Sequence, residues 1–304
     1  MSNSTKWFLL IAGLFVFFGF GVLVLLVLMV VGFGEGDADV TVGSGQKVAV
    51  VELTGEITSS SETVRQLRKY RENHSIKSIL LRVDSPGGGV VASQEIYEEV
   101  RKTRDAGTPV VVSMGSLAAS GGYYVSCGAT TIVANPGTLT GSIGVISQFM
   151  NFDSLMQKVG VGVNTIKSGR FKDAGNPFRA MSPEDVAYFQ GLMDDVHRQF
   201  IATVEHERKI PHDTLVTYAD GRVFTGEQAR TMGLVDTIGT YEDAVEIAAH
   251  LGKIDGEPAI VKERKHGPSL FERLFGEVLA GNLEGVRGEF FHRPILQYRM
   301  VQGF

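Results

Sequence analysis

An apolar run, a glycine triplet and an amphipathic segment follow one another in residues 78–104, SILLRVDSPGGGVVASQEIYEEVRKTR. Ser78–Val83 is short and apolar, which predicts a buried strand. The stretch from Val90 to Arg104 has apolar residues at helical spacing, which predicts a helix with one inward face. The connection between them is tight, as in one half of a strand–helix–strand unit.

The same alternation continues on both sides of this unit. Lys47–Leu53 is rich in valine and predicts an earlier strand, which a helix over residues 59–73 follows. Pro109–Ser113 predicts the next strand. Short apolar strands that alternate with helices predict an α/β fold with parallel pairing.

Downstream of Ser120 the pattern predicts further elements. Ser182 and Pro183, followed by two acids, mark the start of a long helix to about Arg208. The pattern weakens after residue 255, although Pro268–Leu283 is compatible with an amphipathic helix. The other expected elements are a small-residue helix after Ser120, strands at 131–134, 143–148 and 161–166, and a strand–helix–strand–helix unit over 221–235 and 240–251.

The N-terminus contains the longest apolar run. No charged residue occurs from Trp7 to Phe33, and about 20 apolar residues suffice to span a bilayer. A cleaved signal peptide is the alternative, but its apolar region would be shorter and a small-x-small cleavage site would follow it. Lys6 before the run and acids after it predict a cytoplasmic N-terminus and an extracytoplasmic catalytic domain in the cell membrane.

These observations divide the chain into five segments. The segments are an N-terminal tail (1–6), a transmembrane signal anchor (7–33), a flexible linker (34–46), a catalytic domain (47–254) and a C-terminal extension (255–304).

Composition excludes several classes of function. The 304 residues include 29 Lys and Arg against 34 Asp and Glu, without a basic cluster, so a nucleic-acid-binding surface is not expected. Cys127 is the single cysteine, which rules out an internal disulfide and a cysteine-rich zinc site. We interpret it as a small buried apolar residue.

The glycine triplet of DSPGGG (84–89) allows a ligand to approach backbone N–H groups closely. Three interpretations are open: a phosphate cradle, an oxyanion hole for an acyl intermediate, or a plain tight turn. A P-loop would continue with Gly-Lys-Ser or Gly-Lys-Thr, and Val90-Val91-Ala92 does not.

Ser120 lies between small residues in SLAASGGYY (116–124), after a strand and before a helix. A nucleophilic serine is typically placed on such a turn, although a serine that only caps the helix would also fit. The segment differs from the GxSxG elbow of α/β-hydrolases because Ala118 replaces the first glycine.

A base for Ser120 has to come from elsewhere in the chain. None of the seven histidines lies in a glycine-rich or loop-like segment, so a Ser-His-Asp triad is not expected. The loop KSGRFKD (167–173) contains two lysines, Lys167 and Lys172. A lysine acts as a base only when its pKa falls well below about 10.4, and spacing alone does not choose between the two. The histidines are His74, His197, His206, His212, His250, His266 and His292.

Four motifs, in order, resemble the signal peptide peptidase A family of Ser–Lys serine proteases (family S49), which is related to the Clp protease and crotonase folds. They are DSPGGG (84–89), AASGGYY (118–124), LTGSIGV (139–145) and KSGRFKDAGNPF (167–178), and the match runs from about Lys47 to Leu251. The resemblance implies stacked βαβ units with a helical extension.

The resemblance also implies the roles of five residues. Ser120 would be the nucleophile, Lys172 the general base, and Ser142 the residue that holds the lysine amine. The backbone N–H groups of Gly88 and Gly121 would form the oxyanion hole. No metal or other cofactor is implied.

The implied substrates are released signal peptides and similar apolar peptides. The chain resembles the short form of the family, in which a homo-oligomeric ring of protomers builds the chamber. Two alternatives remain: a related membrane protease that acts in quality control, and a crotonase-type acyl-CoA enzyme, for which Ser120, Ser142 and Lys172 would have no use.

Overall fold

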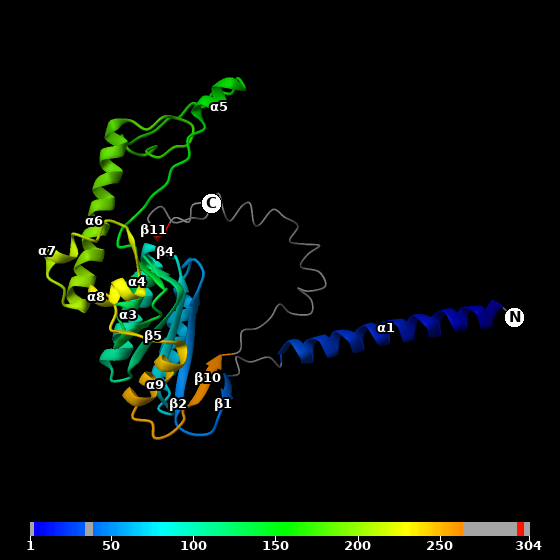
Figure 1. Ribbon diagram of the computed structural model, residues 1–304. Coiled ribbons are helices and arrows are strands. Elements are labelled where there is room, and N and C mark those ends of the chain that lie inside the picture. The colour runs from blue at the N-terminus through cyan, green and yellow to red at the C-terminus, as the bar shows by residue number, and fades with distance from the viewer. Residues whose placement is uncertain (1–2, 34–38, 264–296, 301–304) are drawn as a thin grey trace. The chain divides into compact units, whose positions relative to one another are not determined.

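The computed structural model describes residues 3–33, 39–263 and 297–300, and Figure 1 shows their helices and strands. The chain divides into two compact units, Met1–Val40 with Glu263–His266, and Thr41–Lys262 with Gly267–Phe304. The first unit contains helix α1 (Asn3–Phe33), which agrees with the helix expected from the apolar run.

The expected membrane span is not supported. Within the residues that the structure describes, no helix qualifies by length and hydropathy as one that crosses a bilayer. The prediction of a transmembrane helix at residues 7–33 therefore has no support in the structure.

A nine-stranded sheet has the order β1-β10-β2-β3-β5-β6-β9, with β7 beside β5 and β8 beside β7. Parallel pairing joins seven of these strands and confirms the expected α/β architecture. They are β2 (Lys47–Thr54), β3 (Ile76–Ser85), β5 (Val110–Ala119), β6 (Thr131–Ala134), β7 (Leu139–Gly141), β9 (Thr237–Ile238) and β10 (Ala259–Glu263). The other two are β1 (Asp39–Val42) and β8 (Val223–Thr225).

Helices cover both faces of the sheet. In β2, Val48 and Val50 pack in one apolar cluster with α9, whereas Ala49 and Val51 pack in a larger cluster on the opposite face. A strand buried on both faces needs a continuous apolar sequence, which explains the valine-rich run at this position. The helices of the second unit are α2 (Ser61–Glu72), α3 (Val90–Asp105), α4 (Gly121–Ser126), α5 (Asp153–Lys158), α6 (Pro183–Arg208), α7 (His212–Leu215), α8 (Gly226–Thr231) and α9 (Tyr241–Leu251).

The start of α6 follows from its sequence. The Ser182 hydroxyl accepts a hydrogen bond from the Asp185 N–H at 3.1 Å, and the Asp185 carboxylate accepts one from the Ser182 N–H at 3.0 Å. This capping box satisfies N–H groups that the first helical turn leaves without partners.

Two predicted strands are wrong. The strand expected at residues 143–148 is replaced by β7 at 139–141 and a single bridge from Ile146 to Gln297. No strand forms at 161–166, where Val161, Val163 and Ile166 are exposed. Apolar alternation produces a strand only where a partner strand is available, and this segment pairs with none of the described strands.

Three strands lie outside the range for which the sequence indicated regular structure, and one of them, β1, lies within the expected flexible linker 34–46. β10 adds to the sheet beside β2, and β11 (Gln297–Arg299) pairs with β4 (Gly87–Gly89) in a separate two-stranded sheet. The amphipathic helix suggested for 268–283 lies outside the described residues.

Candidate active site

Ser120 sits in an unusual backbone conformation between β5 and α4. Its φ of 54° lies in the left-handed region, which costs a non-glycine residue free energy and is often retained at functional sites. Its side chain is fully buried, and its hydroxyl has no hydrogen-bond partner within the described part of the chain. A buried hydroxyl held on a strained turn without a structural bond is available for chemistry.

Ser142 lies next to Ser120 because their two strands are neighbours. β5 and β7 pair in parallel with Ala119 opposite Gly141, so each serine follows a paired residue. The Ser120 N–H donates to the Gly141 carbonyl at 2.8 Å. Four non-glycine residues of the described chain have a positive φ, and both Ser120 and Ser142, with a φ of 50°, are among them.

The glycine triplet forms β4 and approaches the same place. A Cβ on Gly88 would lie 2.2 Å from the Ile57 carbonyl oxygen, and a Cβ on Gly87 would lie 2.6 Å from the Gly121 nitrogen. Real Cβ atoms essentially never approach other atoms this closely, so only glycine fits at either position. The close packing explains two of the three glycines, and the triplet forms a strand instead of a plain tight turn.

The polar groups of Gly88 face away from Ile57. The Gly87 carbonyl accepts from the Ile57 N–H at 2.9 Å, and the Gly89 N–H donates to the Ile57 carbonyl at 2.8 Å. Since backbone groups alternate along a strand, the Gly88 N–H and carbonyl point to the opposite edge. That edge is occupied by β11, with Tyr298 opposite Gly88.

Residues 297–300 thus lie in an extended conformation across the site. Gln297 exchanges two backbone hydrogen bonds with Ile146, at 3.0 and 3.2 Å, and the Met300 N–H donates to the Pro86 carbonyl at 2.8 Å. The segment is held between β4 and residue 146. No periodic signal in the sequence predicts a strand here, because three residues are too few to show one.

The structure does not bring Lys172 to Ser120. Lys172 is exposed, and its amine has no hydrogen-bond or ion-pair partner among the described residues. It belongs to the segment between α5 and α6, which lies at the N-terminal end of α6 and projects beyond the sheet (Figure 1). The Ser120 hydroxyl and the Lys172 amine therefore form no hydrogen bond within the described part of this single chain.

The neighbouring Lys167 has a different environment. Its amine donates to the Asp173 carboxylate and to the Arg170 carbonyl at 3.0 Å. Arg179 bonds the same carboxylate, at 3.0 Å. The hydrogen bonds from Arg179 and then Lys167 lower the pKa of Asp173 to about 2. Lys167 therefore stabilises the loop. Of the two lysines in KSGRFKD, Lys172 is the one whose amine has no partner among the described residues.

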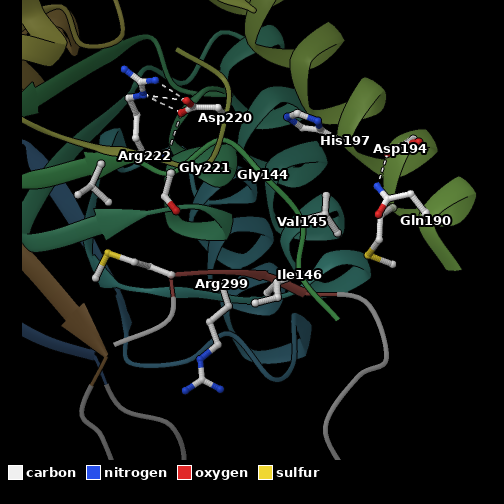
Figure 2. A pocket seen from close by; sticks show the side chains of 14 residues that line it. Gly144, Val145, Ile146, Gln190, Asp194, His197, Asp220, Gly221, Arg222 and Arg299 are labelled. Carbon is white, nitrogen blue, oxygen red and sulfur yellow. Dashed lines mark hydrogen bonds and ion pairs between the residues drawn. The ribbon is translucent and has the colours of Figure 1, made fainter. Parts of the chain in front are cut away.

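A cavity of about 780 Å³ opens beside Ser142 (Figure 2). His197 of α6 and the ion pair between Asp220 and Arg222 lie in its wall. The His197 Nε2 atom is buried without a partner in the described chain. The sequence offered no reason to select His197 from among the seven histidines, because its place next to the site depends on how α6 packs.

Cys127 lies behind the site and is buried. Burial raises the pKa of its thiol to about 12, so the thiolate needed for nucleophilic attack is absent near neutral pH. This agrees with the structural role expected from the sequence.

A serine on a strained turn, next to a glycine strand that pairs with an extended segment, is an arrangement typical of enzymes that act on peptides. The model of peptidase family S49 matches residues 102–255, and the Clp protease model matches residues 40–138. The chain belongs to peptidase family S49, and it is a protease with a mixed α/β fold.

Three relatives illustrate the similarity. A candidate protease of Synechocystis sp. is 41% identical over 78% of this chain and 88% of its own length. Protease 4 of Salmonella typhi is 39% identical over 69% of this chain but only 35% of its own length. A candidate signal peptide peptidase of Enterococcus faecium is 36% identical over 67% of this chain and 63% of its own length.

One solved structure also resembles the chain. A point mutant of ClpP1 from Listeria monocytogenes aligns with a TM-score of 0.44 at 15% identity, over 64% of this chain and 93% of that chain.

Proposed function

We propose that this chain is a serine endopeptidase that hydrolyses extended apolar peptides, released signal peptides among them. Ser120 is the nucleophile, Lys172 is the general base, Ser142 positions the lysine amine, and the N–H groups of Gly88 and Gly121 receive the oxyanion. The name of the Enterococcus faecium relative supports the choice of signal peptides as substrates.

One observation carries the proposal. An extended segment of the chain, β11, pairs with β4 beside Ser120, so this edge of β4 accepts a strand in the way that a bound peptide would require. Adding a strand to an exposed edge is a common mode of peptide recognition. An acyl-CoA thioester contains no peptide chain with side chains along it, which makes it the control substrate for a peptidase assay.

In the proposed reaction, the Ser120 oxygen attacks the peptide carbonyl carbon while Lys172 accepts the hydroxyl proton. The tetrahedral oxyanion is held by the two backbone N–H groups. The peptide C–N bond then breaks, and the protonated lysine gives its proton to the leaving amine. Water hydrolyses the acyl-enzyme by the same steps and releases a carboxylate.

Assembly into a ring accounts for the distance of Lys172 from Ser120. Ser120 is buried without a partner, and Lys172 projects on an arm with an unpaired amine, both within the described part of one chain. A repeated heterologous contact whose rotation closes on itself forms a ring, and such a contact would bring the arm of one protomer to Ser120 of the next.

Mixing two inactive variants tests this assembly. We expect Ser120→Ala and Lys172→Ala proteins, each inactive alone, to regain part of the wild-type peptidase activity when they are mixed and reassembled. A mixture that stays inactive, or a monomer that is fully active in sedimentation fractions at micromolar concentration, would contradict the proposal.

Ser142 is expected to act through Lys172. We expect Ser142→Ala to lower kcat by about 10- to 100-fold with little change in KM, because the amine is less well positioned. Since Ser142 has a positive φ, Ser142→Gly removes the hydroxyl without backbone strain and should behave in the same way. The exposed Ser116→Ala serves as a control; unchanged kinetics in both Ser142 variants would rule out the positioning role.

Location in the cell membrane, with the catalytic domain on the extracytoplasmic side, stays a prediction from the composition of residues 7–33. Membrane fractionation of the full chain, with protease accessibility of intact cells, checks both parts of it.

A further inference from the structure

Strand β5 is irregular just before it reaches Ser120. Its first part pairs with β6 and its last residues pair with β7, so it changes partner along its length. On its other side, Val83 of β3 lies opposite Met114 of β5. Two residues later along β3, Ser85 lies opposite Ala118. β3 therefore advances by two residues while β5 advances by four, which is a bulge in β5.

The bulge determines where Ser120 lies relative to the glycine triplet. β4 begins two residues after β3 ends, and Ser120 directly follows β5, so the distance between them depends on how β3 and β5 pair. A strand rises about 3.3 Å per residue, and two additional residues place Ser120 about 6–7 Å short of its position in a regular ladder. The Gly87 Cα then lies 3.1 Å from the Cβ position of Gly121, the residue after Ser120. Without the bulge this contact would be lost.

The side chain of Asp84 occupies the bulge. Its carboxylate accepts a hydrogen bond from the Leu117 N–H at 3.0 Å. Gly115 leaves the space for this carboxylate, since a Cβ on Gly115 would lie 2.6 Å from the Asp84 Cγ. An ionised acceptor makes a stronger hydrogen bond than a neutral one. Asp84 thus binds a backbone N–H of β5 at the level where the pairing with β3 is irregular.

Two threonines hold the same stretch of β5 from its other edge. Thr138 and Thr140 are both buried. The Thr138 hydroxyl donates to the Gly115 carbonyl at 2.8 Å, and the Thr140 hydroxyl donates to the Ala118 carbonyl at 2.7 Å. The Thr138 hydroxyl also accepts from the Asn135 N–H at 3.1 Å. Side chains on both sides of β5 therefore fix the backbone between Gly115 and Ala118.

We infer that Asp84 is a positioning residue for the nucleophile. Its bond to the Leu117 N–H holds the bulge, and the bulge sets the place of Ser120 beside the glycine triplet. The inference rests on the proposed role of Ser120 in peptide hydrolysis. Asp84 acts through the backbone, so its loss should slow the chemical step and leave substrate binding unchanged. A reacting group that is misplaced by about 1 Å can lower a rate by about 100-fold.

Steady-state kinetics of Asp84→Ala in the full chain, with an apolar fluorogenic peptide, test the inference. We expect kcat to fall by about 10- to 100-fold while KM changes by less than about twofold. Asp84→Asn keeps a side-chain oxygen that accepts from Leu117, so it should restore kcat to within about threefold of the wild type.

Thr130→Val is the matched control. The Thr130 hydroxyl accepts from the Val110 N–H at 3.1 Å at the start of β5, far along the strand from Ser120. Its loss weakens the same strand by the same kind of bond, and kcat should stay at the wild-type value. If Asp84→Ala does not fold, Thr138→Val removes the donor to the Gly115 carbonyl and tests the bulge from the other side, with Thr138→Ser as the rescue.

Labelling of Ser120 by a fluorophosphonate supplies the second measurement, and its rate should fall together with kcat in Asp84→Ala. A folded Asp84→Ala protein with the wild-type kcat, or Asp84→Asn as slow as Asp84→Ala, would overturn the inference and leave the peptidase function standing. An equal loss of kcat in Thr130→Val would also overturn it, because the cause would be a general weakening of β5. A wild-type chain that neither labels at Ser120 nor cleaves peptides would instead overturn the proposed function.

Discussion

Replacing Ser120 by alanine is expected to lower peptidase kcat by about 10⁴- to 10⁶-fold, because the nucleophile is lost and water alone has to attack. The hydroxyl is buried and makes no hydrogen bond within the described residues, so its removal costs the fold little. Thermal unfolding should therefore be close to that of the wild type. Rates of hydrolysis are measured with an apolar peptide that carries a fluorophore and a quencher.

Two further variants make this result interpretable. Ser120→Gly relieves the positive φ and should be equally inactive, whereas Ser116→Ala, on the preceding strand β5 but exposed, should retain full activity. A folded Ser120→Ala protein that keeps more than about a tenth of the wild-type rate would show that another residue attacks the peptide.

The second large effect is expected for Lys172→Ala, which should lower kcat by about 10³-fold or more because the proposed base for the Ser120 proton is lost. Nucleophile and base act as a unit, so the double variant should be hardly slower than either single variant. Lys167→Ala is the matched control. Since Lys167 is bound to Asp173 and Arg170 in its loop, its loss should cost less than about tenfold.

The pH dependence separates the lysine from a histidine. A lysine base acts as the neutral amine, so kcat/KM of the wild type should rise toward alkaline pH. His197 lines the cavity beside Ser142 and is the histidine to test. An ascending limb near pH 6.5, together with inactivation by His197→Ala, would assign the base to His197 instead.

The central part of the site could be predicted from the sequence because it depends on short-range features. Ser120 and Gly88 each follow a strand that the sequence predicts, and parallel strands bring their carboxyl ends to one edge of a sheet. Ser142 differs, because the sequence predicts a strand after it and the structure has β7 before it. The motifs around Ser120 and Gly88 are therefore sufficient to place these residues together. Pairing of β5 with β7 places Ser142 beside Ser120, whereas the resemblance implied for Ser142 only a role in holding the lysine amine.

Long-range features could not be predicted in the same way. Lys172 lies on a projecting segment whose position depends on tertiary packing rather than on its own sequence. The strand expected at residues 161–166 is absent because it has no pairing partner among the described strands. Conversely, β10 and β11 are short strands that form because each lies beside a partner strand. Similarly, only the packing of α6 distinguishes His197 from the other helical histidines, because it places His197 in the cavity wall.

The most direct test of the account is covalent labelling of the full chain by a fluorophosphonate, an electrophile that reacts readily with activated serine nucleophiles. Intact-mass and peptide-mapping measurements should find one adduct, on Ser120, with labelling abolished in Ser120→Ala and strongly slowed in Lys172→Ala. A single adduct on any other residue, or labelling of Ser120 at the wild-type rate in the Lys172→Ala protein, would contradict the assignment of Ser120 and Lys172 as nucleophile and base.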